Sequence, residues 1–446
     1  MFYLNRDIEL TPVLLEKMLT KFRGIRESSI KVAKEYYDGI QAIKNKHYTD
    51  PSKPCNKTVI NYCKNIVDSY CGYLATPGYI SYSSEQDIES IMDIMRYNDY
   101  QAEDSNLLLD ALIHGVAHEL MYIDNFGKTR FRLINPQQCF GIYDDSLTSD
   151  LLYFVRFYKV NEWDETDTTH HIDVYTDKEI RHYTMSSEAG IPTPTGVEPH
   201  YFGQCPANIL VMPDEKSIFD CIKGLQDSVN TLLSAEIDDY QAFCDAYLTL
   251  EGADADDDYA AMKENRILIL PQGAKASWLT KNANDAQVEN MLKRIHDSIY
   301  RIAACVDFGS ETFTGGVSSG IAIQFKLSGM ETRCGKIEAE MRKALQRRIE
   351  IIAGIASLQL GEEVWRDINI EFTRNVPADE YNLINSIMSL KGLVSDETLL
   401  AQLPFISDPA AELEKLKKQK KDNQLYAVNI FGTGEDTEEE DEENLE

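Results

Sequence analysis

The sequence has no long hydrophobic run and no basic, apolar leader at its N-terminus. Its apolar stretches are far shorter than the roughly 18 residues that a membrane-spanning helix needs, so we expect no membrane segment. The first residues, MFYLNRDIELTP, contain acids and a proline where a signal peptide has a basic and then an apolar stretch. We therefore expect the chain to be made in a cytosol.

The sequence also lacks the cysteine patterns of zinc sites and disulfide frameworks. It has nine cysteines, an odd number, and no pair has the CxxC spacing. Zinc sites and disulfide-rich folds use closer and more regular spacings. We expect buried free thiols at all nine positions, which are Cys55, Cys63, Cys71, Cys139, Cys205, Cys221, Cys244, Cys305 and Cys334.

Positive charge is scarce. The chain has 44 Lys and Arg against 74 Asp and Glu, a formal net charge of −30. Nine of the last twelve residues are acidic, and removing those nine charges from −30 still leaves −21. Because DNA affinity comes mainly from Lys and Arg at phosphates, this balance argues against a DNA-binding factor. It does not argue against a surface past which DNA slides.

The pattern of hydrophobic residues predicts a mixed α+β protein. Residues 1–128 are expected to be mostly helical, with Leu108, Leu112 and Val116 at helical spacing. Residues 129–183 are rich in aromatic and β-branched residues between turn signals, which is typical of an antiparallel meander. The stretch SSEAGIPTPTGVEPH, residues 186–200, is predicted to be a loop.

Three long helices are predicted in the second half of the chain. One covers residues 218–247 and a second begins near Asp285; the compact insert between them contains a short strand, RILIL. A third, residues 318–360, contains Gly329 and Gly335, which make a bend or break plausible. A strand, WRDINIEFTRNVP, and short helices over 378–420 follow, and the acidic tail is expected to be disordered.

The glycine-rich loop after the second helix resembles a nucleotide-binding loop only superficially. Gly315 and Gly320 have the Walker A spacing, but Ile321 and Ala322 stand where lysine and a hydroxyl residue are required. The loop also follows a helix rather than a strand. Asp307-Phe308-Gly309 spells the kinase magnesium motif, but no HRD loop or VAIK-like strand accompanies it. We expect no nucleotide, cofactor or kinase chemistry here.

Two patterns could suggest a metal. His114 and His118 are one helical turn apart, but the zincin order HExxH is absent, so a buried structural helix is the preferred interpretation. Asp254, Asp256 and Asp258 alternate as in a calcium loop, yet Tyr259 and Asn265 occupy its glycine and glutamate positions. A solvated acidic turn is preferred, and weak divalent binding stays open.

Five segments in order resemble the portal proteins of tailed double-stranded DNA bacteriophages, in the branch typical of long-tailed phages of Gram-positive hosts. The first segment is YYDGIQAI followed by NKTVINYCKNIVDSYCGYLATPGYISYSS. The other four are ALIHGVAHELMYIDNFGKTRFRLINPQQCFGIYDD, DCIKGLQDSVNTLLSAEIDDYQAFCDAYLTLEG, FGSETFTGGVSSGIAIQFKLSGMETRC and INIEFTRNVPADEYNLINSIMSLKGLVSDETLLAQLPFISDPAAELEKL. The resemblance covers about residues 30–420. Gly316-Val317 replaces the family's usual Gly-Asn, and the insert near residues 250–284 is short.

The resemblance implies a mainly helical α+β portal fold. Its regions would be a wing at 1–213, stem helices at 214–247 and 285–306, a clip at 248–284, a channel (tunnel) loop at 307–318, a long helix and strand at 319–374, a crown at 375–430 and an acidic tail at 431–446. In this family the chain would not be an enzyme. It would form a homo-oligomeric ring, a dodecamer in the virion, at one capsid vertex, after synthesis in the bacterial host's cytoplasm.

The same resemblance implies partners and site residues. Double-stranded DNA would pass through the ring, which would contact the terminase large subunit, the head-tail adaptor, and the major capsid and scaffolding proteins. The channel loop would comprise Phe308, Gly309, Ser310, Glu311, Thr312, Phe313, Thr314, Gly315, Gly316, Val317 and Ser318. DNA-proximal stem residues would be Lys293, Arg294 and Arg301. Clip contacts with motor or adaptor would be Asp256, Asp257, Lys263, Arg266, Lys275 and Trp278.

Two alternatives remain open. One is another virion structural or adaptor protein. The other is a metal-dependent enzyme with an unrecognised carboxylate site, near Asp254 to Asp258.

Overall fold

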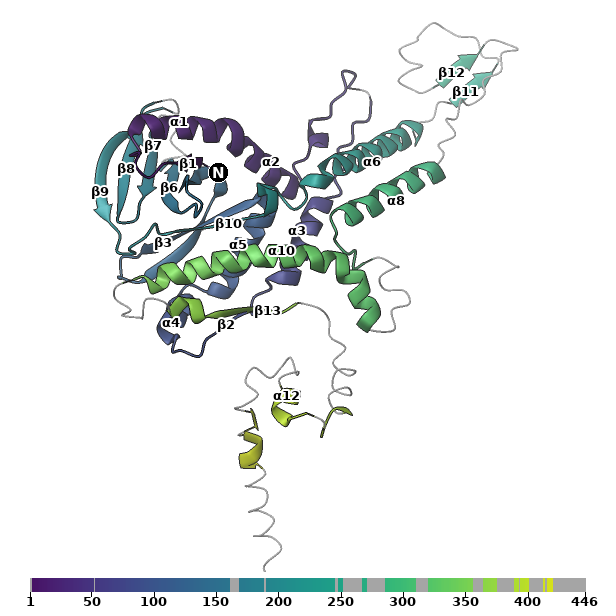
Figure 1. Cartoon of the computed structure of the whole chain (residues 1–446). Coiled ribbons are helices and arrows are strands. Elements are labelled where there is room, and N and C mark those ends of the chain that lie inside the picture. The colour runs from purple at the N-terminus through teal and green to yellow at the C-terminus, as the bar shows by residue number, and fades with distance from the viewer. Residues whose placement is uncertain are drawn as a thin grey trace, which may run out of the picture. The chain divides into compact units, whose positions relative to one another are not determined.

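The structure is a computed structural model. It describes residues 2–51, 53–160, 168–187, 190–244, 248–251, 267–270, 285–309, 320–355, 364–374, 389–392, 394–400, 412–413 and 415–419. The chain divides into two compact units, Met1–Asn375 and Val376–Glu446. The first unit contains helices and several small sheets, which confirms the predicted mixed α+β class (Figure 1). No helix within the described ranges is long and apolar enough to cross a membrane.

A six-stranded sheet in the first unit contains most of the predicted meander. Its order is β1 (Phe2–Leu4), β5 (Cys139–Asp144), β6 (Leu151–Tyr158), β7 (His170–Tyr175), β8 (Glu179–Met185) and β9 (Thr193–Pro199). All neighbours are antiparallel except β1 and β5, which are parallel. The loop predicted for residues 186–200 is wrong over β9. Pro194 and Pro199 are tolerated there because β9 is an edge strand, whose residues are all exposed.

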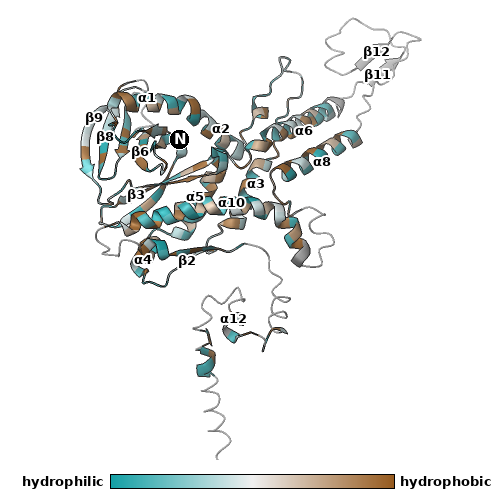
Figure 2. Cartoon of the chain, viewed as in Figure 1, coloured by the Kyte–Doolittle hydropathy of each residue, from teal (hydrophilic) through white to brown (hydrophobic). Residues whose placement is uncertain are grey.

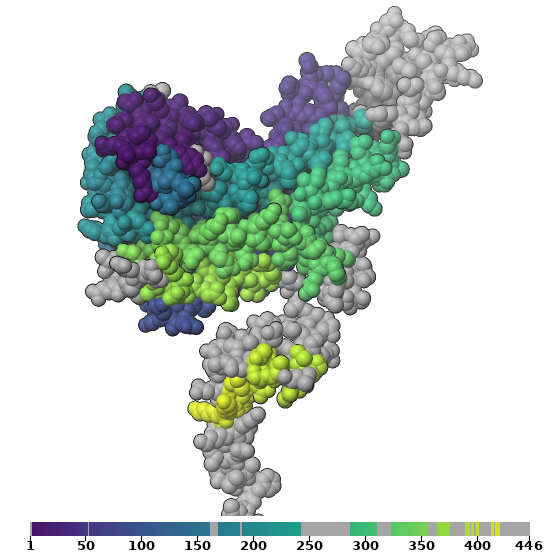
Figure 3. All heavy atoms as spheres, in the orientation of Figure 1, coloured from purple at the N-terminus to yellow at the C-terminus, as the bar shows by residue number. Residues whose placement is uncertain are grey.

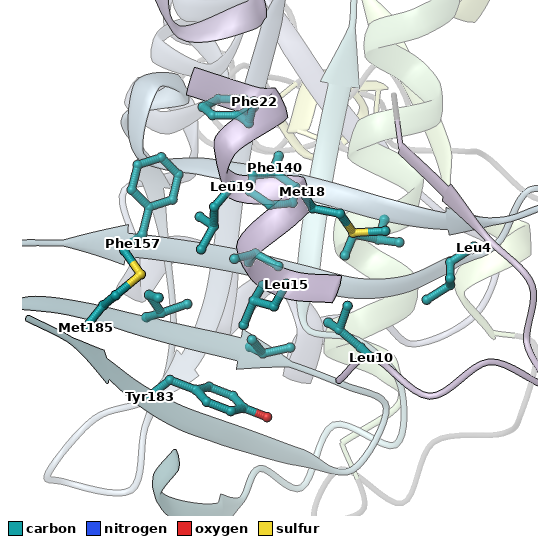
Figure 4. Packing of buried hydrophobic residues seen from close by; sticks show 14 of the residues in the cluster. Leu4, Leu10, Leu15, Met18, Leu19, Phe22, Phe140, Phe157, Tyr183 and Met185 are labelled. Atoms are coloured by element: carbon teal, nitrogen blue, oxygen red, sulfur yellow. The ribbon is translucent and has the colours of Figure 1, made fainter. Parts of the chain in front are cut away.

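One face of this sheet is covered by α1 (Pro12–Phe22), and a hydrophobic core lies between them (Figure 4). Thr11 caps the helix with its side chain, and Pro12 occupies the first turn, where its missing N–H costs nothing. Leu15, Met18, Leu19 and Phe22 follow helical spacing and are buried. Phe22 stacks on Phe140 of β5 with ring centroids 5.1 Å apart. The helical spacing of these buried residues is a local feature that is visible in the sequence itself.

A second, three-stranded sheet corrects the predicted helix through His118. Helix α5 (Tyr100–His114) ends at Gly115, and the chain continues as β3 (Val116–Ile123), between β10 (Ala207–Val211) and β4 (Thr129–Ile134). Gly115 has a φ of +80°, and its N–H bonds to the Ala111 carbonyl, as in a glycine helix terminus. A Cβ here would lie 2.7 Å from the backbone of Glu215 and Lys216. The helix therefore stops where only glycine fits.

The N-terminal part, predicted to be mostly helical, contains four further helices. They are a π-helix at Arg23–Glu27, α2 (Ser28–Tyr37), α3 (Tyr62–Leu74) and α4 (Glu89–Tyr97). Short 3-10 helices lie at Ala42–Asn45, Pro136–Gln138, Pro213–Glu215, Asp220–Ile222 and Val364–Asp367. The late strand β13 (Asn369–Phe372) was predicted, and it pairs antiparallel with β2 (Ile80–Ser83).

A buried ionic cluster joins elements far apart in the sequence. Arg348, fully buried, donates to both carboxylate oxygens of Glu119 at 2.8 and 2.9 Å and also to Asp104. Tyr82 donates to Asp104 at 2.7 Å, and Asn208 to Glu119 at 3.1 Å. Burial raises the pKa of Asp104, against the opposing effect of the guanidinium. The cluster satisfies charges that would be costly to bury alone.

The three predicted long helices are present in the second half of the chain. They are α6 (Lys223–Cys244), α8 (Asp285–Ile302) and α10 (Gly320–Ala353). Helix α10 passes through Gly329 and Gly335 without interruption as a 34-residue helix, and Figure 1 shows a bend in its N-terminal part. Between α6 and α8, β11 (Leu248–Glu251) pairs in parallel with β12 (Ile267–Leu270), which is the predicted RILIL strand.

The second unit is described only in short pieces. One helix, α12 (Asp396–Leu400), lies within the predicted SDETLLAQL helix, and residues 415–419 are helical too. The acidic tail, predicted to be disordered, lies outside the described residues.

Candidate functional site

The predicted DNA-path residues fall partly within the described ranges. Phe308 and Gly309 are exposed at the start of the predicted channel loop, and residues 310–318 lie outside the described residues. Lys293, Arg294 and Arg301 are exposed on α8, and none forms an ion pair with another described residue. All predicted clip contacts, and the Asp254 to Asp258 turn, also lie outside the described residues.

Helices α6 and α8 lie side by side, and Figure 3 shows their atoms in contact. Ile299 of α8 and Val229 of α6 are buried, as their spacing predicts. Other apolar residues of the two helices are not covered within the single chain. Tyr240 is 71% exposed, Met291 43% and Ile302 49%. Figure 2 shows hydrophobic and hydrophilic residues along both helices.

A polar ladder fixes α6 to the segment that precedes α3. Gln226, Asn230, Ser234 and Asp238, one per turn, are buried on one face of α6. Their side-chain oxygens accept hydrogen bonds from alternate backbone N–H groups, which belong to Tyr62, Ile60, Thr58 and Asn56 at 3.0, 3.1, 3.0 and 2.6 Å.

The ladder works because two periods match. Four helical residues advance about 6.0 Å along the axis. Two extended residues advance about 6.6 Å. The spacing of alternate N–H groups in an extended segment therefore matches that of successive helical turns, and each of these four donors finds an acceptor on α6. Sequence reasoning missed this, although polar residues repeating every four positions in a helix were the available signal.

The ladder is anchored at its far end by an ion pair. Lys46 donates to Asp238 at 2.5 Å, and Asn56 donates to it through both its backbone and its side chain. Burial alone favours the neutral acid, but the hydrogen bonds from Lys46 and Asn56 outweigh it and lower the pKa of Asp238. In the middle of the ladder, Asn230 also donates to the side chain of Gln41.

The C-terminal end of α8, where the predicted channel loop begins, is held by side chains from two other helices. The Tyr70 hydroxyl of α3 donates to the carbonyls of Ala303 and Ala304 at 3.0 and 2.8 Å. Arg333 of α10 donates to the Ala303 carbonyl at 2.6 Å and to the Ile218 carbonyl at 2.8 Å. The last carbonyls of a helix lack intrahelical partners, so these bonds satisfy them.

An aromatic cluster lies beside the same helix end. The His296 ring is 4.9 Å from that of Tyr300 and 5.7 Å from that of Tyr62. His296 Nε2 is 3.4 Å from a carboxylate oxygen of Asp307, whose other oxygen accepts from the Gly309 N–H at 3.0 Å. Burial, and secondarily the Asp307 charge, raises the pKa of Tyr62. Asp307-Phe308-Gly309 thus forms a turn closed by the Asp307 side chain.

The two histidines weighed as a metal pair lie on different elements. His114 ends α5, and its Nδ1 is 3.3 Å from the Ile30 carbonyl, while His118 is buried on β3. Burial lowers the pKa of His118 to about 3, so its ring is neutral. Among the described residues, no group of three or more His, Cys, Asp or Glu could hold a metal.

The side chains of eight cysteines are described, and all eight are free thiols. Six of the eight are buried, in agreement with the sequence prediction. Cys55 and Cys221 are exposed, so the prediction of burial is wrong for these two. Burial raises the pKa of the Cys63 thiol to about 12, which keeps it protonated and unreactive.

Comparisons with known proteins point to one family. The profile of the family described as "Phage portal protein, SPP1 Gp6-like" matches residues 26–425. The portal protein of Bacillus phage SPP1 is 20% identical over 440 residues, covering 93% of this chain and 86% of that protein. The portal protein of Clostridium phage phiCD119 is 20% identical over 450 residues, covering 92% and 98%.

The match therefore defines a class, the portal proteins of bacteriophages. Within that class, the chain belongs to the SPP1 Gp6-like family of phage portal proteins. This makes it a structural, non-enzymatic protein of the virion, as the sequence predicted. Family membership implies an oligomeric ring, association with DNA and a position at a capsid vertex.

Proposed function

We propose that copies of this chain form a ring-shaped channel through which double-stranded DNA is packaged and later ejected. The ring, a dodecamer in the virion, also serves as the docking platform for the terminase motor and then the head-tail adaptor. During assembly it contacts the major capsid and scaffolding proteins. The observation that carries the proposal is the family match over residues 26–425. The wing, stem, clip, channel loop and crown ranges predicted from the sequence belong to this proposal.

Two observations on single residues support a ring. Tyr240, Met291 and Ile302 expose apolar surface on α6 and α8, the helices proposed as the stem. A head-to-tail ring buries such surface between neighbouring copies, because each copy presents two different faces. Phe325 of α10 is 76% exposed and adds to the surface available for such contacts.

Charge supports a channel rather than a clamp. With a net charge of −30, most of the surface repels a polyanion, so DNA meets few counter-charges strong enough to hold it. Lys293, Arg294 and Arg301, exposed and without described ion-pair partners, would supply weak contacts at the stem. Weak contacts keep the free-energy barrier to DNA sliding low.

Electron microscopy of the purified protein tests the proposal. We expect closed rings with an open central channel wide enough for duplex DNA. Capsids assembled with these rings should protect DNA from nuclease when a motor and ATP are present. A protein that stays monomeric under all assembly conditions would contradict the proposal. Rings without an open channel would instead indicate an adaptor.

A further inference from the structure

One guanidinium contacts both the segment that enters α6 and the segment that leaves α8. Arg333 Nη1 bonds to the carbonyl of Ala303, the residue that follows the last residue of α8. Arg333 Nη2 bonds to the carbonyl of Ile218, five residues before α6 begins. Ala303 and Ile218 are both buried, whereas Arg333 itself lies in the middle of α10. A single side chain therefore connects α10 to the entry and the exit of the predicted stem.

The local geometry favours arginine at this position. A helix C-terminus carries partial negative charge, so a cation is stabilised there. The guanidinium also lies 5.7 Å from the centroid of the Tyr70 ring, whose hydroxyl bonds the same Ala303 carbonyl. Two donors in a planar fork reach two carbonyls from different segments at once, which a lysine ammonium does less well. Ala304, with a φ of +49°, then turns the chain out of the helix.

The two elements that Arg333 joins, the end of α8 and helix α10, flank the predicted channel loop in the sequence. That loop leaves α8 just beyond Ala303 and enters α10 at about Gly320. Arg333 lies thirteen positions further along α10, about 20 Å at 1.5 Å per residue. Both ends of the loop thus belong to elements that Arg333 joins. A cleft lined by Ile302, Gly329 and Lys336 runs beside the guanidinium, so the contact is not enclosed on every side.

We propose that Arg333 is a positioning residue that holds the entry of α6 and the exit of α8 against α10, and that DNA packaging through the ring depends on this connection. The inference rests on the proposed function. The two carbonyl contacts join the stem to α10, and the Tyr70 hydroxyl holds the end of α8 from a third helix. Loss of the guanidinium uncouples α10 from the stem without removing any residue of the loop.

The test compares Arg333→Gln and Arg333→Lys with Arg347→Gln as the matched control. Arg347 lies on the same helix, but it bonds to the side chains of Gln204 and Glu350 rather than to the stem. We expect Arg333→Gln rings to protect at least tenfold less DNA in capsids, Arg333→Lys rings to lose less, and Arg347→Gln rings to stay within twofold. Hydrogen exchange of the assembled rings should rise at residues 303–309 in Arg333→Gln and stay unchanged in strands β5 to β8.

Each other outcome decides against the inference. Packaging by Arg333→Gln equal to that of the Arg347→Gln control would overturn it, and so would unchanged exchange at residues 303–309. If Arg333→Gln forms no rings, Arg333→Lys decides: rings that package normally, or no rings at all, both exclude a positioning role. The exchange measurement needs no DNA. A failure of the unaltered rings to package DNA would therefore contradict the proposed function separately.

Discussion

At the scale of single residues, Gly115 decides where a helix becomes a strand. Its left-handed backbone ends α5, and its missing side chain lets the Glu215 and Lys216 backbone approach. The spacing of Leu108, Leu112 and Val116 suggested one continuous helix because it carries no information about that approach. The end of α5 is thus determined by a contact with residues about a hundred positions away in sequence.

We expect Gly115→Ala to destabilise the protein by more than about 1 kcal/mol, because the positive φ and the backbone clash add. The matched control is Gly78→Ala, since Gly78 has a φ of +92° but no atom lies within 4 Å of the position that a Cβ would occupy. Urea unfolding of both variants provides the comparison. Equal losses for the two variants would mean that the clash is relieved by small shifts.

Asp110 makes stability depend on pH. Burial raises its pKa to about 6, with Lys34 opposing the shift. A folded pKa above the unfolded one, about 3.9, means that the folded state holds its proton longer. Stability contributed by this group is therefore greatest below about pH 4 and falls as pH rises towards 6.

Asp110→Asn should accordingly gain stability relative to the unaltered chain at pH 7 and gain little at pH 4. Thermal melts at both pH values measure the difference. The control is Asp93→Asn, an exposed acid paired with Arg96 on α4. A gain that is the same at both pH values would show that titration of Asp110 is not its source.

At the scale of elements, the polar ladder determines how α6 is attached to the N-terminal part of the chain. A buried helix face that carries Gln, Asn, Ser and Asp would be unfavourable without partners. Here the backbone of residues 56–62 supplies the donors, and the two elements are about 170 residues apart in sequence. Packing and hydrogen bonding therefore act together in holding the proposed stem.

Asn230→Ala should cost about 1–3 kcal/mol, because it leaves the Ile60 N–H and the Gln41 side chain without their partner. Thr231→Ala is the matched control, since Thr231 is exposed and its hydroxyl bonds only to the Asp227 carbonyl of its own helix. Urea unfolding gives the free energies, and hydrogen exchange at residues 56–62 reports the ladder directly. Protection of those amides unchanged in Asn230→Ala would contradict the role assigned to the ladder.

At the scale of the whole molecule, net charge and family membership both bear on how the protein meets DNA. An acidic ring exerts little hold on DNA, and the family places the chain in the virion. The loop that first suggested a phosphate cradle lies between two long helices, and it lacks the lysine that would hold a nucleotide. In the proposed channel, we expect its glycines to serve movement rather than binding.

Replacement of Gly315 and Gly316 with proline should leave ring assembly intact and block DNA packaging, because proline restricts a loop that must move. Electron microscopy checks the rings, and nuclease-protected DNA in capsids checks packaging. Replacement of the same two glycines with alanine, which restricts the backbone less, is the control. Normal packaging by the proline variant would count against a mobile channel loop.

Sequence by itself determined the elements whose signal is local. Periodicity predicted α6, α8 and the strands β5 to β8, because burial of one face imprints spacings of 3.6 and 2 on the chain. Short apolar runs argued against a membrane span, the missing Walker lysine argued against a nucleotide site, and the order of five segments indicated the family.

Tertiary structure decided the rest, because those features depend on partners distant in sequence. Strand β9 exists because β8 offers an edge, α5 ends where another backbone passes, and α6 buries polar residues that a separate segment satisfies. Arg333 does not stand out among the Lys and Arg of α10 until the fold brings Ala303 and Ile218 to its two donors. Spacing along one helix carries no record of such contacts, since each requires two segments whose approach only the folded chain specifies.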